Sequence, residues 1–213
     1  MILVGQYDSP YVRRVAITLH HYGLHFTRNP ISVFSDAEAM AKINPLGRIP
    51  SLVLDDGEVL IDSGAIIDHL DELAGPERAL TPRWGAPRRR VLRLIAVATG
   101  AIDKAGAVVY ERHFHPPGKV NEAWAARCKG QMLGGLAFLE AQLTRDWLAG
   151  ERFTQADLTT AVLLGYLRLR MPEIALDREF RRLAELSERC EAMRSFTAAR
   201  PSADEVMPAG GKI

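Results

Sequence analysis

The first 75 residues alternate strand-like and helix-like segments, and this order constrains the fold more than any other feature of the sequence. Short runs of branched apolar residues predict strands, and amphipathic stretches that begin at Ser or Asp predict helices. We expect strands at 1–6, 25–31, 51–54 and 58–61 and helices at 9–23, 36–43 and 62–75. The order βαβαββα predicts a small α/β domain with a hairpin at one end of its sheet.

The rest of the chain carries helical periodicity and no strand signals. A Pro-containing segment at residues 76–86 predicts a linker. Helices are then expected at 87–113, 119–144, 156–170 and 177–190, with a shorter one near 193–199. We therefore predict an α/β domain at 1–75, the linker at 76–86, and an all-helical domain at 87–213.

The composition excludes several classes of protein. A hydrophobic content of 47% is high enough to bury a core, which excludes a disordered chain. Only two cysteines are present, Cys128 and Cys190, too few for a disulfide framework or a zinc cluster, and they indicate a reducing compartment. No apolar run approaches the roughly 18 residues that a membrane span needs, and the first residues do not resemble a signal peptide. We expect a cytoplasmic protein without a membrane partner.

The net charge of +1 is distributed unevenly along the chain. Residues 1–75 hold 5 Lys and Arg against 10 Asp and Glu, a net charge of −5, and residues 76–213 hold 22 against 16, a net charge of +6. A total near zero argues against a nucleic-acid or membrane-surface binder. The run Arg88-Arg89-Arg90 with Arg93 has no interleaved aromatic residues, so it favours a solvated helix face or a subunit contact over a nucleic-acid patch.

Four motifs occur in order along the chain. They are Ser9-Pro10-Tyr11 with Arg14, the run Asn-Pro-Leu-Gly-Arg-Ile-Pro at 44–50, Asp62-Ser63, and the run Phe-Thr-Gln-Ala-Asp at 153–157. Together they make the chain resemble the cytosolic glutathione transferase family over essentially its whole length, and the first motif looks most like bacterial members. The resemblance implies a thioredoxin-like, glutathione-binding first domain and a helical second domain that carries the electrophile side.

Ser9 is the candidate catalytic residue. A Ser followed by Pro begins a helix, because Ser caps a backbone N–H and Pro has none to leave unpaired. A thiolate bound beside this hydroxyl would be stabilised by a hydrogen bond and by the positive end of the helix dipole. Within the family, Cys at this position is typical of the disulfide-exchanging classes, and Ser is typical of the classes that only stabilise the glutathione thiolate. The resemblance therefore implies that the reacting sulfur belongs to glutathione.

Tyr7 competes with Ser9 for this role. Some classes of the family use a Tyr just after the first strand as the thiol partner, but the residues that follow Tyr7 have the Ser-Pro pattern, which favours Ser9. A purely capping role for Ser9 is a further alternative. The isomerase class of the family often carries Ser and Cys close together at this position. In this chain Tyr11 occupies the place comparable to that Cys, which weakens assignment to the isomerase class.

Four residues are expected to hold the tripeptide: Ile49, Pro50, Asp62 and Ser63. The resemblance implies a cis Pro50, which aims the backbone N–H and C=O of Ile49 outward to pair with the cysteinyl part of glutathione. It also implies that Ser63 receives the γ-glutamyl carboxylate at a helix N-terminus while Asp62 faces the ammonium group. Ordinary strand and capping roles are the alternatives for these residues.

The second domain contributes a structural motif and most of the residues of a candidate pocket. Thr154 and Asp157 predict a capping box at the start of a central helix. The resemblance implies a mixed aromatic substrate pocket, and ordinary core packing is the alternative. Its candidate residues are Tyr7, Tyr11, Tyr110, His113, Phe114 and Tyr166. His113 and His115 could bind a metal, but a third ligand is not evident, and we predict no metal.

These features predict a glutathione transferase that uses glutathione as co-substrate and adds its thiol to a small, hydrophobic electrophile, as in detoxification. The same thiolate would serve a glutathione-dependent isomerase or reductive dehalogenase, and a non-catalytic glutathione-binding or regulatory module is a further alternative. The resemblance implies a homodimer, to which Asp103 could contribute across the two-fold axis. The charge division then predicts electrostatic complementarity between subunits.

Overall fold

The computed structural model describes residues 1–116 and 118–206, which divide into two units. The first unit holds residues 1–79 and 192–206 and is α/β, and the second holds residues 80–191 and is helical. This confirms the predicted fold class. The exact domain boundaries stay predictions: residues 192–206, which we assigned to the helical domain, group with the first unit, and residues 207–213 lie outside the described residues.

The sheet of the first unit has the strand order β2-β1-β3-β4. The strands are β1 (Ile2–Val4), β2 (Thr27–Asn29), β3 (Ser51–Val53) and β4 (Val59–Ile61). β1 pairs in parallel with β2, where Leu3 faces Arg28, and antiparallel with β3, where Leu3 faces Leu52. β3 and β4 form the predicted hairpin. Leu3 and Leu52 are fully buried, so the middle of the sheet belongs to the core of this unit.

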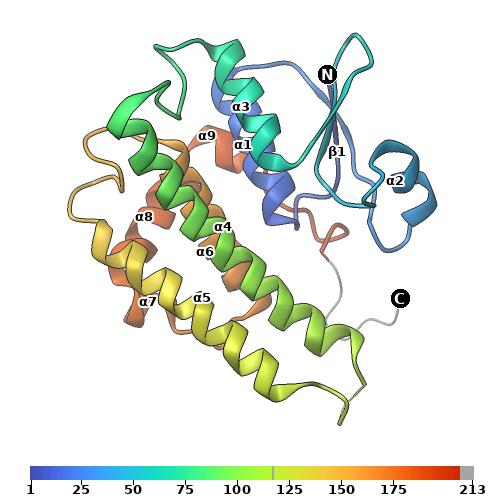
Figure 1. The fold of residues 1–213 in the computed structure, drawn as a ribbon, viewed down its shortest axis with the longest axis vertical. Helices are drawn as coiled ribbons and strands as arrows, with labels where there is room; N and C mark the ends of the chain where they lie inside the picture. Colours follow the sequence, from blue (N-terminus) through green and yellow to red (C-terminus); the bar gives the residue numbers. More distant parts are fainter. Residues whose placement is uncertain (117, 207–213) are drawn as a thin grey trace. The chain divides into compact units, whose positions relative to one another are not determined.

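The helices of the first unit are α1 (Pro10–Tyr22), α2 (Ala37–Ile43), α3 (Ser63–Ala74) and the short α9 (Arg194–Thr197). α1 packs against both α3 and α9, as Figure 1 shows. α1 ends at Gly23, which has φ 69°, a left-handed conformation that glycine adopts without steric cost. The contact between α9 and α1 explains why residues 192–206 group with the first unit.

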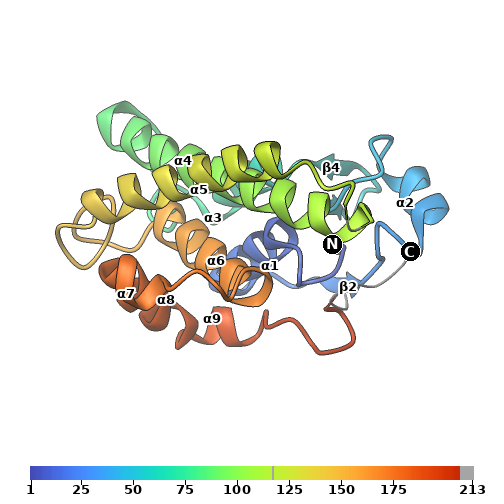
Figure 2. The ribbon, with the colours of Figure 1, turned by 90° about the horizontal axis from the view of Figure 1, so that it is seen from below.

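The second unit consists of α4 (Gly85–Phe114), α5 (Glu122–Gln142), α6 (Gln155–Arg170), α7 (Leu176–Glu179) and α8 (Arg181–Glu191). α4 and α5 run side by side (Figures 1 and 2), and α6 packs against α4 and α8. Nearly every residue from Gln155 to Leu167 is buried, which makes α6 the central helix of this unit. The predicted capping box begins it: the backbone N and Oγ1 of Thr154 each donate to Asp157 at 2.8 Å.

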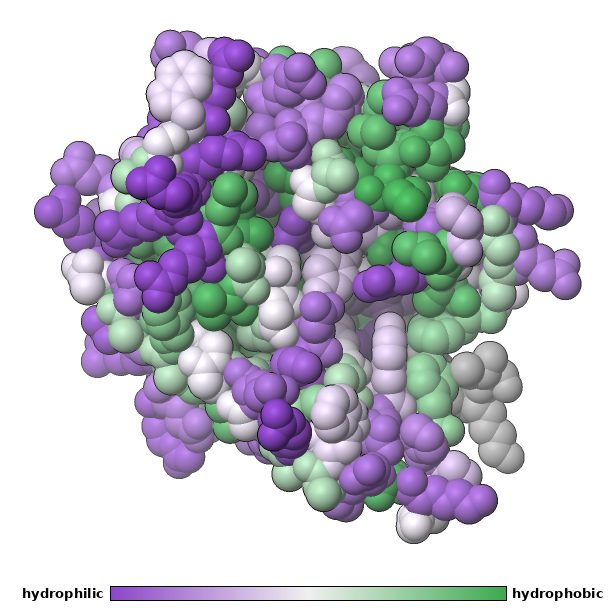
Figure 3. All heavy atoms as spheres, viewed as in Figure 1, coloured by the Kyte–Doolittle hydropathy of each residue, from purple (hydrophilic) through white to green (hydrophobic). Residues whose placement is uncertain are grey.

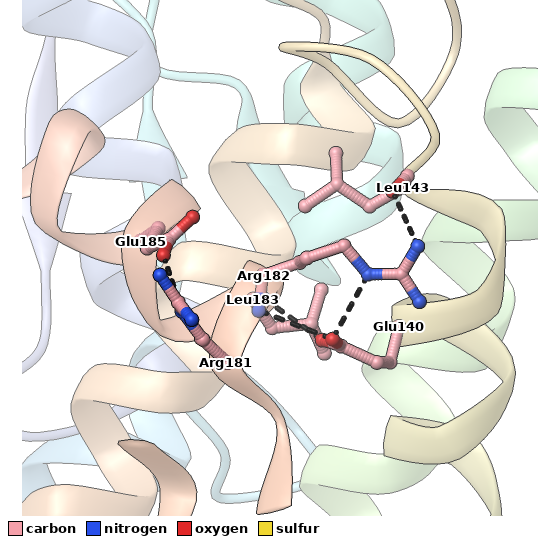
Figure 4. A network of polar contacts seen from close by, with 6 residues as sticks. All are labelled: Glu140, Leu143, Arg181, Arg182, Leu183 and Glu185. Atoms are coloured by element: carbon pink, nitrogen blue, oxygen red, sulfur yellow. Dashed lines mark hydrogen bonds and ion pairs between the residues drawn. The ribbon is translucent and has the colours of Figure 1, made fainter. Parts of the chain in front are cut away.

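The single helix predicted at 177–190 is interrupted at Phe180, and α8 begins anew at Arg181. Glu140, near the end of α5, explains the break (Figure 4). Its carboxylate accepts the backbone N–H groups of Arg182 at 3.1 Å and Leu183 at 2.9 Å, and it also accepts Nε of Arg182 at 3.1 Å. The free N–H groups at the start of α8 thus find their hydrogen-bond partner some forty positions away in the sequence. No local sequence signal could indicate this contact.

Hydrophilic side chains gather over the first half of α4 in Figure 3. Arg89, Arg90 and Arg93 are exposed there, and the guanidinium of Arg93 lies 5.0 Å from the ring centroid of Phe138. For the described residues, the exposure of these arginines agrees with the predicted solvated helix face. No helix within residues 1–116 and 118–206 is long and apolar enough to cross a membrane.

Candidate functional site

The turn between β1 and α1 carries Ser9. Its backbone N donates to the carbonyl of Gln6 at 3.2 Å, which closes the turn, and its carbonyl accepts the first helical N–H from Arg13 at 2.9 Å. The Ser9 hydroxyl oxygen accepts the N–H of Val12 at 3.4 Å, so Ser9 is the predicted N-cap of α1. The half-buried hydroxyl therefore lies at the positive end of the helix dipole.

Tyr7 occupies the same turn but is enclosed by protein. It is 2% exposed, and its buried hydroxyl has no hydrogen-bond partner among the described residues. The guanidinium carbon of Arg28 lies 3.5 Å from the Tyr7 ring centroid. Burial raises the pKa of the Tyr7 phenol above its ordinary value, although Arg28 opposes the shift. The buried Tyr7 hydroxyl is therefore less accessible to a bound thiol than the half-buried Ser9 hydroxyl.

The peptide bond between Ile49 and Pro50 is cis, as expected from the resemblance. The strand ladder of β3 begins at Ser51, so Ile49 lies outside it, at the entrance to the sheet. Gly5, at the end of β1, allows this loop to come close. A Cβ on Gly5 would lie 2.9 Å from Cβ of Ile49 and 2.6 Å from Cγ2 of Val12, and its φ of 126° also favours glycine. Gly5 thus brings the Pro50 loop and α1 together.

Asp62 and Ser63 form the start of α3. Asp62 is the N-cap: its Oδ1 accepts the N–H of Gly64 at 2.7 Å. Its φ of 69° is unusual for a non-glycine residue, and such a conformation costs on the order of 1–3 kcal/mol. Ser63 follows it and is 5% exposed. The capping interpretation is confirmed, while contact with a ligand stays a prediction.

Arg14 is a site residue whose role the sequence did not reveal. It lies on α1, is 3% exposed, and its Nε and Nη1 have no hydrogen-bond partner among the described residues. A Cβ on Gly64 would lie 3.9 Å from Nη2 of Arg14 and 3.1 Å from Oδ1 of Asp62, so the guanidinium is close to the start of α3. Burial lowers the pKa of Arg14 to about 10, against the opposing effects of Tyr11 and Asp62. A desolvated cation beside a helix N-terminus makes this place strongly attractive to an anion.

The proposed pocket residues lie in both units. Tyr7 and Tyr11 belong to the first unit, and Tyr11 is half-buried on α1. In the last turns of α4, the ring centroid of Phe114 lies 5.4 Å from that of Tyr110 and 4.7 Å from that of His113. Tyr166 is 9% exposed on α6. The structure thus brings three of the six residues together, and their role in a pocket stays a prediction.

The remaining candidates have structural explanations. His115 Nδ1 lies 3.1 Å from the carbonyl oxygen of Glu111, and within residues 1–116 and 118–206 no group of three or more His, Cys, Asp or Glu could hold a metal ion. Cys128 and Cys190 are buried and unpaired. Burial, followed by the nearby Asp157 carboxylate, raises the pKa of Cys190 to about 12. Such a thiol is unreactive at neutral pH.

Comparison with known proteins gives consistent matches. The family model "Glutathione S-transferase, N-terminal domain" matches residues 3–78, and "Glutathione S-transferase, C-terminal domain" matches residues 122–189. The uncharacterized GST-like protein YibF of Escherichia coli (strain K12) is 31% identical, over 94% of this chain and 98% of its own. The maleylacetoacetate isomerase of Pseudomonas aeruginosa is 32% identical, over 98% of this chain and 100% of its own.

Solved structures of similar proteins also align over nearly the whole chain. A glutathione S-transferase from Methylobacterium radiotolerans, in complex with glutathione sulfonate, has a TM-score of 0.89 and 31% identity, and the alignment covers 98% of each chain. One from Methylobacillus flagellatus with glutathione bound has a TM-score of 0.89 and 30% identity, over 94% of this chain and 99% of its own.

Proposed function

Because the chain belongs to the glutathione S-transferase family, we propose that it binds glutathione on its α/β unit and adds the sulfur to a small, hydrophobic electrophile. The observation that carries the proposal is the position of the Ser9 hydroxyl, at the N-terminus of α1. The two structural neighbours with bound glutathione or glutathione sulfonate support glutathione as the co-substrate.

The γ-glutamyl end of glutathione would bind at the start of α3. The N-terminal N–H groups of a helix favour a carboxylate, and the Ser63 hydroxyl adds a donor. Arg14 adds a buried positive charge close by. Because two of its nitrogens have no hydrogen-bond partner among the described residues, the free-energy cost of burying this charge is not offset until an anion binds. The Asp62 carboxylate, next to them, would take the ammonium group. The backbone of Ile49 would pair with the cysteinyl part as a further strand does.

Ser9 would then activate the thiol. Lowering a thiol pKa from about 9 to about 6–7 requires roughly 3–4 kcal/mol, at about 1.4 kcal/mol per unit. A hydrogen bond to a charged group contributes about 1.5–3 kcal/mol, and a helix N-terminus about 0.3–2 kcal/mol. These two effects together account for the shift. The thiolate attacks the electrophilic carbon with its electron pair, and the C–S bond forms while a leaving group departs or an added carbanion takes a proton.

The electrophile would contact the aromatic cluster at the end of α4, formed by Tyr110, His113 and Phe114. Tyr110 is 47% exposed, so part of its ring is accessible to a ligand. Tyr7, Tyr11 and Tyr166 stay candidate pocket residues on the sequence argument alone. The proposal includes a cytoplasmic homodimer in which the −5 and +6 parts of the sequence complement each other.

Glutathione-dependent isomerisation is the second candidate function, favoured by the similarity to a maleylacetoacetate isomerase over 100% of that protein. An isomerase would use the same thiolate: sulfur adds to a conjugated double bond, the adduct rotates about the resulting single bond, and sulfur leaves again. Glutathione is then regenerated, which is the difference that an experiment can detect.

The experiment measures glutathione binding by calorimetry and then incubates the protein with a panel of aryl halides, epoxides and cis-unsaturated diketo acids. Mass spectrometry follows the product and the remaining glutathione. Conjugate formed with equal loss of glutathione supports the transferase. A rearranged acid with glutathione unchanged supports the isomerase. Tight binding without turnover of any electrophile would identify a non-catalytic module, and no binding would reject the proposal.

A further inference from the structure

The turn that carries Ser9 is connected to the last described residues of the chain through three side chains: Tyr7, Arg28 and Glu205. We propose that Arg28 and Glu205 are positioning residues, which hold the Tyr7 ring and through it orient the Ser9 hydroxyl toward the bound thiol. This inference rests on the proposed function of Ser9. All three residues belong to the same α/β unit.

The Arg28 guanidinium stacks on the Tyr7 ring in direct contact. Its carbon lies 3.5 Å from the ring centroid, the distance expected for a cation against a π face. Arg28 is on β2, an edge strand of the sheet, so its side chain approaches Tyr7 from a rigid element. The stack therefore fixes the position of the ring relative to the sheet.

Glu205 binds the same guanidinium. Its carboxylate forms an ion pair with Nη2 of Arg28, and the Glu205 side chain is only 6% exposed. The same carboxylate accepts the backbone N–H of Ser202 at 3.2 Å and the Ser202 hydroxyl at 3.0 Å. The two hydrogen bonds from Ser202 orient this buried carboxylate independently of the arginine, so it restrains the position of Arg28.

The restraint passes from Tyr7 to Ser9 through a short turn. Ser9 is two residues from Tyr7, and the hydrogen bond from Ser9 N to Gln6 O at 3.2 Å includes Tyr7 within the turn. The cap from Val12 to the Ser9 hydroxyl is long, at 3.4 Å, so it does not fix the hydroxyl strictly by itself. A movement of the Tyr7 ring would therefore change the direction of this hydroxyl.

A second contact anchors the other side of Ser9. Nε of Arg13, in the first turn of α1, donates to the carbonyl of Ala199 at 3.1 Å, and its guanidinium lies 5.9 Å from the Phe196 ring centroid. Arg13 thus contacts the segment 196–205 directly, and Tyr7 is linked to it through Arg28. Reactive geometry is sensitive to displacements of about 1 Å, so this segment is suited to set the activity of Ser9.

The test compares Glu205→Gln and Arg28→Met with Glu77→Gln, a control that removes the same charge at an exposed position of the same unit. We expect kcat at pH 7 to fall about five- to tenfold in both test variants, with the pH–rate profile moved toward higher pH. The KM for glutathione should change less than about twofold, because the binding residues are elsewhere. The double variant should be no worse than the poorer single variant, because the two residues act as one unit.

Several results would overturn the inference. One is a test variant that matches Glu77→Gln in kcat and in pH profile, and another is a rise in KM at constant kcat. If Arg28→Met does not fold, Glu205→Gln decides alone, because Glu205 lies in a terminal segment outside the helices and strands. The proposed function fails in a different way: the wild-type protein itself would neither bind glutathione nor turn over an electrophile.

Discussion

The hydroxyl oxygen of Ser9 lies 3.4 Å from the backbone nitrogen of Val12 and accepts its N–H at the first turn of α1. A hydroxyl that accepts a hydrogen bond in this way still has its own proton to donate. Acceptance from the helix also polarises the O–H group, which strengthens its donation to an anion. The cap and the proposed thiolate interaction are therefore compatible, and the one supports the other.

Replacing Ser9 with Ala removes this donor. We expect the conjugation rate at pH 7 to fall by about one to two orders of magnitude, because about 1.5–3 kcal/mol of thiolate stabilisation is lost. Affinity for glutathione should change little, since the tripeptide is held elsewhere. Steady-state kinetics measure both, with Ser35→Ala, an exposed serine in the loop before α2, as the control. Unchanged turnover in Ser9→Ala would point to Tyr7.

Replacing Tyr7 with Phe tests that alternative directly. The ring and its contact with Arg28 are retained, while a buried hydroxyl without a partner is removed. We expect most of the activity to remain and the free energy of unfolding to rise or stay within about 1 kcal/mol, because an unsatisfied polar group is lost. Kinetics and urea unfolding provide the measurements. A hundredfold loss of rate would show that the Tyr7 hydroxyl takes part in the chemistry.

Gly5→Ala should disturb the binding loop. The new methyl group would lie 2.6 Å from Val12 Cγ2 and 2.9 Å from Ile49 Cβ, so both neighbours must move. We expect a loss of about 2–4 kcal/mol in the free energy of unfolding from steric overlap and backbone strain, and weaker glutathione binding. Gly57→Ala is the matched control, because its φ of 91° is also positive but nothing lies within 4 Å of the added carbon. Equal effects of the two substitutions would refute the role of Gly5.

Arg14→Met should separate binding from stability. The arginine is buried with two nitrogens unpaired, so an apolar replacement relieves its desolvation and should leave the fold at least as stable. Glutathione affinity should fall about tenfold or more, because the carboxylate loses a buried cation. Calorimetry measures affinity and thermal unfolding measures stability. A large loss of stability with unchanged affinity would make Arg14 a purely structural residue.

Stability should decrease on acidification partly through His20. Burial, followed by repulsion from Arg28, lowers the pKa of His20 in the folded protein. The unfolded chain then binds more protons than the folded chain below about pH 6.5, so the free energy of unfolding falls as the pH drops from about 7 to about 5. His20→Gln should flatten this part of the profile in urea unfolding. An identical slope in the variant would exclude His20 as a contributor.

Much of the α/β unit was predictable because its signals are local. The Ser9-Pro10 and Asp62-Ser63 helix starts and the 51–61 hairpin depend on neighbouring residues, and the structure confirms each of them. The break at Phe180 was not predictable, because its cause is the Glu140 carboxylate on another helix.

The candidate site shows the same division. Ser9 and Asp62 were identifiable as caps from adjacent residues. Arg14 appeared only as part of a motif, because its burial near the start of α3 is a tertiary property. Glu205 gave no signal, since its partner Arg28 lies 177 positions away in the sequence. Contacts of such separation depend on the complete fold and cannot be derived from periodicity.

The central claim is that Ser9 stabilises the thiolate of bound glutathione, and the most direct measurement is the pKa of that thiol. Ultraviolet difference absorbance of the protein–glutathione complex against pH detects the thiolate without any electrophile. We predict a thiol pKa of about 6–7 in the wild-type complex and an increase of about one to two units in Ser9→Ala. Identical titration curves for the two proteins, at equal saturation with glutathione, would contradict the account.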